Sequence, residues 1–184
     1  MTKKLIQETY INLLTTDGEE KINITKLCET AEINRGTFYK YYQDLDQLLN
    51  DIYTNLFVEL KSIMEAKSLI FNTEELFMYV LNLIEKNKVL FKKLISYQFD
   101  SNLFNIFLSS SKEKFIEELK NYTDNLELIN DIYYYNLTGT LKLISNWVDN
   151  NFDKTKKHLA QEITLFNTIL ITSVLFPNKK QESN

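Results

Sequence analysis

Glycine and proline, the residues that most often interrupt helices, are almost absent from this chain. Its 184 residues include three glycines and one proline, and that proline, Pro177, lies near the C-terminus. So few turn-forming residues favour helices joined by short connections. The apolar share of 44 % and the charged share of 25 % are ordinary for a globular protein that can bury a core. We therefore expect an all-α protein.

Apolar residues recur with the helical spacing of three and four along most of the chain. We expect Asp17 and Gly18 to end the first helix, and Thr25 and Asp44 to cap the second and fourth helices. Two short helices are expected between residues 24 and 42. The longer helices are expected over residues 3–16, 45–67, 74–86, 88–97, 102–121, 126–149 and 156–175.

Residues 24–49 have the pattern of two short helices joined by a tight turn and followed by a longer helix. Helix periodicity turns Phe38 and Tyr42 inward, one helical turn apart. A helix-turn-helix places its second helix in the major groove of DNA. The outward face of that helix would offer a glycine, a hydroxyl, a phenol and a cation: Gly36, Thr37, Tyr39 and Lys40. This face is suited to contact a polyanion.

The segment resembles the DNA-binding domain of the TetR/AcrR family of bacterial transcription regulators. The matching residues are Ile24, Thr25, Leu27, Ala31, Gly36 to Tyr39 (GTFY), Tyr41, Tyr42, Leu48 and Leu49. The resemblance implies a helix-turn-helix domain over residues 1–48, followed by a helical dimerisation and ligand-binding domain over residues 49–184. Two positions depart from the family pattern. Glu32 replaces the turn glycine, which implies an altered or strained turn, and Leu45 replaces a phosphate-contacting lysine.

The resemblance and the outward face together predict the residues that contact double-stranded DNA. They are Thr25, Lys26, Asn34, Arg35, Gly36, Thr37, Tyr39, Lys40 and Tyr41. The net charge of −4 counts against a nucleic-acid binder, although a local basic patch suffices for a small dimeric one. Glu29 and Glu32 lie close to that patch. The alternative is a TetR-like protein with decayed DNA affinity that acts as a protein-binding adaptor.

The C-terminal helices indicate a homodimer. The segment 133–163 resembles the dihydroxyacetone-kinase regulator subgroup in its aromatic run, its glycine at Gly139 and its tryptophan at Trp147. The last helix is apolar on every side, so a partner subunit is its simplest cover. The predicted interface residues are Tyr133, Leu137, Thr140, Ile144, Ile163, Phe166, Ile169 and Leu170. A dimer would present two recognition helices to half-sites about 34–36 Å apart.

Family analogy also predicts a pocket for a small-molecule effector among the aromatic residues of the middle helices. Tyr97, Asn136 and Trp147 are the predicted polar-tipped pocket residues. The alternative is that these aromatic side chains simply fill the core.

Metal and enzyme chemistry have little support in the sequence. One histidine, His158, and one cysteine, Cys28, do not make a metal site, and no cofactor is expected. Glycine-rich phosphate loops and the common hydrolase motifs are missing, so an all-helical enzyme is the weakest alternative. No apolar run reaches the ~18 residues of a membrane span, and the N-terminus does not resemble a signal peptide. We expect a cytoplasmic regulator, by default a repressor, that binds an inverted-repeat operator.

Overall fold

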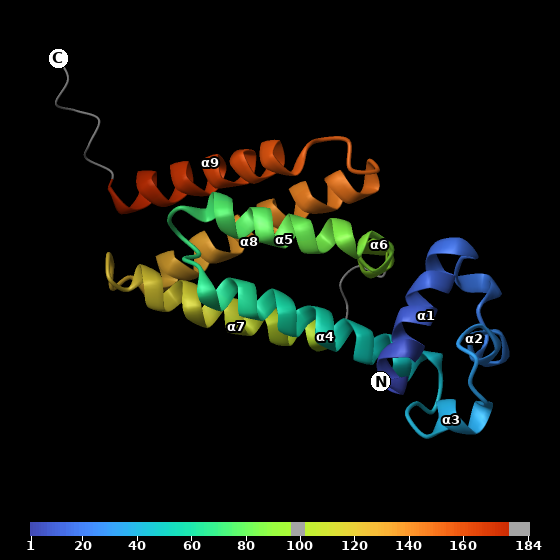
Figure 1. Ribbon diagram of the computed structural model, residues 1–184. Helices are drawn as coiled ribbons and strands as arrows, with labels where there is room; N and C mark the ends of the chain where they lie inside the picture. The colour runs from blue at the N-terminus through green and yellow to red at the C-terminus, as the bar shows by residue number, and fades with distance from the viewer. Residues whose placement is uncertain (97–101, 177–184) are drawn as a thin grey trace, which may run out of the picture. The chain divides into compact units, whose positions relative to one another are not determined.

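The computed structural model describes residues 1–96 and 102–176 of the chain (Figure 1). Within these ranges it consists of α-helices and one short 3-10 helix, Glu19–Lys21, so the all-α prediction is confirmed. Each longer helix begins and ends within two residues of its expected bounds, except that the expected end at residue 97 lies outside the described residues. The α-helices are α1 (Thr2–Thr16), α2 (Ile24–Thr30), α3 (Arg35–Tyr39), α4 (Leu45–Ala66), α5 (Thr73–Lys86), α6 (Lys88–Ser96), α7 (Asn102–Leu119), α8 (Leu126–Asp149) and α9 (Lys156–Leu175).

The chain divides into two compact units, Met1–Val58 and Glu59–Asn184. The first contains α1, α2, α3 and the first part of α4, and the second contains the rest of α4 and α5 to α9. The domain division expected between residues 48 and 49 falls inside α4 and stays a prediction.

The first unit is held together by apolar side chains from each of its helices. Ile6 of α1, Leu27 of α2, Phe38 of α3 and Leu48 of α4 are all fully buried. Full burial of an aliphatic or aromatic side chain contributes about 1.5–3 kcal/mol, which is enough to hold short helices that would be unstable alone.

The helix ends in the first unit follow side-chain capping. Asn34 and Asp44 cap α3 and α4, where their carbonyl and carboxylate oxygens accept from backbone N–H groups at 2.7 Å. The expected cap of α2 was wrong. The side chain of Asn23 caps this helix by accepting from the N–H of Lys26 at 2.9 Å, and Thr25 lies inside the helix. Asparagine is at least as good an N-cap as threonine, so the helix begins earlier.

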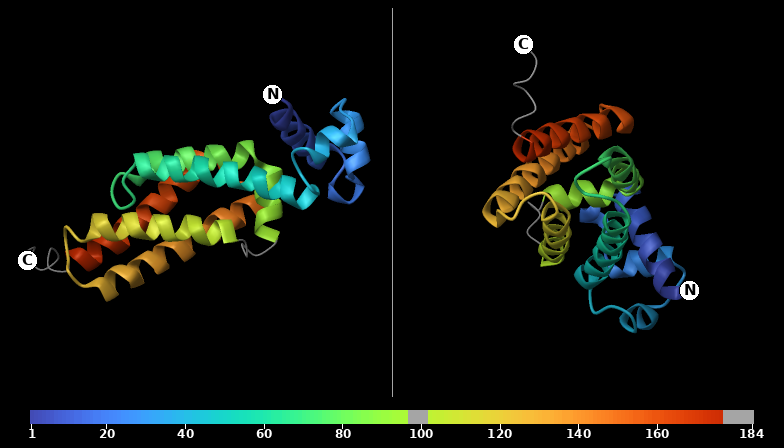
Figure 2. Two further views of the ribbon diagram at one scale, coloured as in Figure 1. Left: turned by 90° about the horizontal axis from the view of Figure 1, so that it is seen from below. Right: turned by 90° about the vertical axis from the view of Figure 1, so that its left-hand side faces the viewer.

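The second unit is a bundle in which α5 lies along α9, and α8 contacts both α7 and α9. Figure 2 shows α8 and α9 running in opposite directions. Its core includes a cluster of buried side chains from α5, α7, α8 and α9, together with the α4–α5 loop: Leu69, Ile70, Leu76, Phe115, Leu119, Ile129, Ile132, Tyr133 and Ile171.

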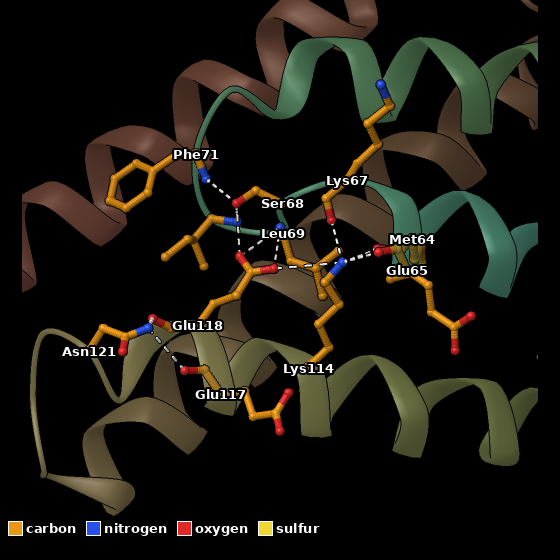
Figure 3. A network of polar contacts seen from close by, with 11 residues as sticks. Met64, Glu65, Lys67, Ser68, Leu69, Phe71, Lys114, Glu117, Glu118 and Asn121 are labelled. Carbon is orange, nitrogen blue, oxygen red and sulfur yellow. Dashed lines mark hydrogen bonds and ion pairs between the residues drawn. The ribbon is translucent and has the colours of Figure 1, made fainter.

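Lys114 of α7 holds the C-terminal end of α4 (Figure 3). Its ammonium group donates to the backbone carbonyls of Met64 at 2.5 Å, Glu65 at 2.8 Å and Lys67 at 2.5 Å. The last carbonyls of a helix have no partner inside the helix, and the helix dipole favours a cation beside them. Lys114 therefore satisfies and charge-stabilises this helix end.

Glu118, one turn further along α7, fixes the loop that follows α4 (Figure 3). Its carboxylate accepts from the backbone N–H of Leu69 at 3.0 Å and from the hydroxyl of Ser68 at 2.8 Å. The Lys114 and Glu118 side chains also form an ion pair of 3.8 Å. Both side chains connect segments about fifty residues apart, and helix periodicity alone does not reveal such a contact.

The last helix is buried on one side only. The side chains of Leu159, Ile163 and Ile171 are buried, whereas Phe166 and Ile169 are about half exposed on the opposite side. The all-round apolar pattern of α9 therefore leaves one apolar face that the subunit itself does not cover. Among the described helices, none is both long and apolar enough to cross a membrane.

Candidate nucleic-acid interface

The turn between α2 and α3 is a helix C-cap built on a left-handed residue. Glu32 has a φ of 53°, the conformation that glycine adopts most readily. The N–H of Glu32 donates to the carbonyl of Glu29 at 3.2 Å, and the N–H of Ile33 donates to the carbonyl of Cys28 at 2.9 Å. These two bonds are those of a Schellman motif. The strained glutamate expected from the sequence is confirmed, and the hydrogen bonds show what maintains it.

Helix α3 is anchored by its inward side. Phe38 is fully buried and Tyr42 is almost fully buried, as periodicity predicted. The side chain of Asn34 accepts from both the N–H of Thr37 at 2.7 Å and its hydroxyl at 3.0 Å. Asn34 and Thr37 are therefore already engaged in positioning the helix.

Exposed cationic and phenolic side chains gather on the outward side of α3. Arg35 and Lys40 are exposed, and Tyr39 and Tyr41 are 50 % and 38 % exposed. The Arg35 guanidinium donates to the Tyr39 hydroxyl at 3.5 Å, and the Tyr39 ring meets Phe38 edge-on at 5.5 Å. Gly36 is exposed between them. This arrangement offers two cations and two phenols to a ligand.

Of the two α2 residues predicted to contact DNA, Thr25 and Lys26, the lysine already has a partner inside the subunit. The ammonium of Lys26 forms an ion pair of 2.6 Å with Asp17, so it faces a carboxylate already. The hydrogen bond from Lys26 lowers the pKa of Asp17 below its ordinary value. Thr25 is exposed beside it. Lys26 can therefore contact a DNA phosphate only if the phosphate replaces Asp17 as its ion-pair partner.

Acidic residues lie beside the cations of α2 and α3. A hollow of about 880 Å³ between α2 and the start of α4 is lined by Lys26 and Arg35 but also by Glu29, Asp44 and Asp46. Its lining includes Leu45, the position where the family pattern has a lysine. Cations on this side are thus partly balanced by acids.

A polar network that sequence reasoning missed ties α1 to α4 behind α3. The Asp51 carboxylate accepts from the Tyr42 hydroxyl at 2.8 Å, the Gln7 amide at 2.6 Å and the Lys3 ammonium at 3.0 Å. Burial alone would raise the pKa of Asp51, but hydrogen bonds from Lys3 and Tyr42 outweigh burial and lower it. Burial and the bond to Asp51 raise the pKa of Tyr42. The network fixes Tyr42, the last anchor of the α3 region.

Two of the three predicted effector residues, Asn136 and Trp147, lie within the described residues, and the effector site stays a prediction. Tyr97 lies outside the described residues. Trp147 is buried, its indole N–H donates to the carbonyl of Lys154 at 2.8 Å, and its ring packs edge-on against Phe152 at 4.7 Å. It closes the α8–α9 turn instead of offering a polar tip to a pocket. Asn136 lies three turns earlier and lines the α8–α9 groove, and its buried Nδ2 atom has no hydrogen-bond partner among the described residues.

The predicted dimer residues differ in how deeply they are buried in the subunit. Tyr133, Ile144 and Ile163 are buried within the subunit, and their assignment to an interface stays a prediction. Periodicity could not tell which side of each helix faces its own subunit. Phe166 and Ile169 are half exposed and, with Thr140 and Leu170, line the α8–α9 groove. Leu137 is partly buried beside the core cluster.

Comparison with protein families identifies the class of the chain. A TetR-type family model described as "Transcriptional regulator C-terminal region" matches residues 72–168, more than half of the chain. The chain therefore belongs to the TetR family of transcriptional regulators.

Two comparisons relate the chain to the DhaS subgroup. The HTH-type dhaKLM operon transcriptional activator DhaS of Lactococcus lactis subsp. lactis (strain IL1403) is 27 % identical over 108 residues, 59 % of this chain and 55 % of that protein. The match thus spans about half the length of this relative. The solved structure of the dihydroxyacetone kinase operon activator DhaS has the same fold, with a TM-score of 0.71 over 94 % of this chain and 97 % of that chain at 21 % identity. Both resemblances inferred from the sequence are confirmed.

Proposed function

We propose that this regulator is a cytoplasmic, non-enzymatic homodimer that binds an inverted-repeat operator through α3. The observation that carries the proposal is the outward side of α3, where Arg35, Tyr39 and Lys40 are exposed while Phe38 anchors the helix from behind. A rigid helix with cations and phenols on its free side suits the major groove, where arginine and lysine contact guanine and phosphate.

The charge distribution supports modest, salt-sensitive binding. Arg35 and Lys40 supply phosphate or guanine contacts, whereas Glu29 and Glu32 repel the DNA backbone. Each phosphate contact releases counterions, so affinity falls steeply as salt rises. Only a few contacts are available on each subunit, and the dimer must therefore engage both half-sites to bind tightly.

The exposed apolar face of α8 and α9 supports the homodimer. Tyr135, Phe166 and Ile169 are each at least half exposed on this face. Large contiguous apolar patches on a subunit generally mark interaction sites. We place Leu137, Thr140, Phe166, Ile169 and Leu170 at the interface and leave out the three buried residues.

Two arguments bear on whether this regulator activates or represses transcription, and they point in opposite directions. The family resemblance predicted repression, whereas both named relatives are described as activators, one of the dhaKLM operon and one of a dihydroxyacetone kinase operon. We propose activation, because the relatives belong to the same subgroup. A reporter fused to the promoter beside the gene should lose expression when the regulator is deleted, and a gain of expression would restore the repressor prediction. An effector would act by binding better to one spacing of the two DNA-binding units than to another.

Substitutions on the outward side of α3 test the DNA-binding proposal. Duplex selected from a random library by the full-length protein is the ligand, and fluorescence anisotropy measures its affinity. Arg35→Ala, Tyr39→Ala and Lys40→Ala should each weaken binding about tenfold or more while the oligomeric state stays unchanged. Lys4→Ala, which removes an exposed cation of α1, is the matched control and should bind normally.

The second candidate, a protein-binding adaptor with decayed DNA affinity, is favoured by Glu29, Glu32 and Leu45. If the selection enriches no sequence and the three variants bind DNA like the wild type, the adaptor is the better description.

A further inference from the structure

The outward side of α8 carries four residues spaced three or four apart: Asp131, Tyr135, Thr138 and Lys142. We call these four residues the α8 stripe. All four are exposed, and Tyr135 is 72 % exposed. They line a groove of about 1020 Å³ whose other wall is α9. The stripe therefore lies on the face that the proposed homodimer would cover.

The α8 stripe is self-complementary in charge and in size. Asp131 and Lys142 lie five to six residues on either side of a midpoint between Asn136 and Leu137. At a rise of 1.5 Å per residue, each is about 8 Å from that midpoint. A second α8 crossing antiparallel at the midpoint brings Asp131 opposite Lys142 of the partner subunit. It also brings Tyr135 opposite Thr138 of the partner subunit.

The position of the exposed apolar residues on α9 agrees with the same midpoint. Helices α8 and α9 run in opposite directions and are joined by residues 150–155. The midpoint lies 12 to 13 residues before the end of α8 at Asp149. Because α9 runs back along α8, the α9 residues beside this midpoint lie 12 to 13 residues after Lys156, at Thr168 and Ile169. Ile169 is 53 % exposed there, and Phe166 lies one turn away. A two-fold axis through both midpoints makes the contact isologous.

Two further observations show that the subunit itself does not use these features. Within the described part of the chain, neither Asp131 nor Lys142 forms an ion pair, although other exposed lysines such as Lys4 and Lys61 do. A Cβ atom added at Gly139 would meet nothing within 4 Å, so packing inside the subunit does not require glycine there. In the antiparallel register, Gly139 lies at the level of Tyr134 of the partner subunit, and the open space at the glycine leaves room for a large side chain there.

We propose that the α8 stripe is a charge code that selects a second copy of this chain and sets the register of the dimer. Asp131 pairs with Lys142 of the partner subunit, and the two-fold axis repeats the pair. The inference rests on the proposed homodimer and specifies which partner it accepts. Like charges placed opposite each other are costly, so a subunit that brings a base opposite Lys142 or an acid opposite Asp131 is rejected.

Charge reversal in the full-length protein tests this code. In Asp131→Lys and in Lys142→Asp, both repeats of the pair become like-charged, and we expect the dimer dissociation constant to rise at least about tenfold. An equimolar mixture of the two variants restores both attractive pairs and should form heterodimers. The double variant Asp131→Lys/Lys142→Asp should form homodimers like the wild type. Analytical ultracentrifugation gives the dissociation constants, and native mass spectrometry of differently tagged chains identifies the heterodimers.

Control reversals at exposed positions outside the groove, Glu113→Lys and Lys157→Asp, should leave the dimer unchanged. Circular dichroism melts verify that every variant is folded. If the wild type is monomeric throughout, the homodimer proposal fails and this inference fails with it. If the wild type is dimeric but the single variants dimerise normally, or their mixture shows no preference for heterodimers, the antiparallel α8 register is wrong while the homodimer stands.

Discussion

Replacing Glu32 by glycine should stabilise the protein. Glu32 is held at a φ of 53° in the turn between α2 and α3 by the two hydrogen bonds of the Schellman motif. The side chain is exposed, so its removal sacrifices no packing. The gain comes from relief of the contact between Cβ and the backbone that this conformation imposes.

The expected size follows from two opposing terms. A left-handed conformation costs a residue with a Cβ about 1–2 kcal/mol, and glycine does not bear this cost. Glycine in turn loses more conformational freedom on folding, which costs about 0.5–1 kcal/mol. The net expectation is a free energy of unfolding higher by about 0.5–1 kcal/mol. For a chain of this size that corresponds to a rise in Tm of about 1–4 °C.

Urea unfolding and circular dichroism melts of the full-length protein measure this effect. Glu32→Ala is the control, because it removes the carboxylate but keeps the Cβ atom, and its stability should be no higher than that of the wild type. If the alanine variant is stabilised as much as the glycine variant, charge repulsion and not backbone strain is the cause. A destabilised glycine variant would refute the reasoning altogether.

Three further substitutions probe polar contacts elsewhere in the structure. Lys114→Met leaves three carbonyls near the end of α4 without their donor, and urea unfolding should show a loss of about 1–3 kcal/mol. Trp147→Phe removes the indole N–H that closes the α8–α9 turn and leaves a gap against Phe152, so Tm should fall by several degrees. Asp51→Asn should cost about 1–3 kcal/mol at pH 7. Because the pKa of Asp51 is lowered in the folded state, the stability that its charge contributes is present above about pH 4 and is lost as the pH falls through the lowered pKa. Unfolding at pH 7 and pH 3 should therefore show the difference between this variant and the wild type shrinking at the lower pH.

Helix positions could be predicted from the sequence because the chain is nearly free of glycine and proline and its apolar residues keep the helical period. The inward anchors Phe38 and Tyr42 followed from periodicity alone. Glu32 was identified because the family pattern has a glycine there. Each of these features depends on residues that are close together in the sequence, so a single sequence is enough to predict it.

Contacts between segments that are distant in the sequence could not be predicted from helix periodicity. Lys26 was expected to face DNA, but its ion pair with Asp17 depends on how α2 lies beside the end of α1. Trp147 was expected in a pocket because its tip is polar, whereas the α8–α9 turn brings the Lys154 carbonyl to that tip. Tyr133 and Ile163 were assigned to a dimer because they are apolar, although apolar side chains serve a subunit core equally well.

The most direct test of the central claim is binding of the purified full-length protein to DNA fragments flanking its own gene, measured by mobility shift over a series of salt concentrations. The account predicts saturable binding to one fragment containing an inverted repeat, with affinity that falls steeply as salt rises, and loss of that binding in Arg35→Ala and Lys40→Ala. Weak binding that is equal on every fragment and unchanged in these variants would contradict it and favour the adaptor.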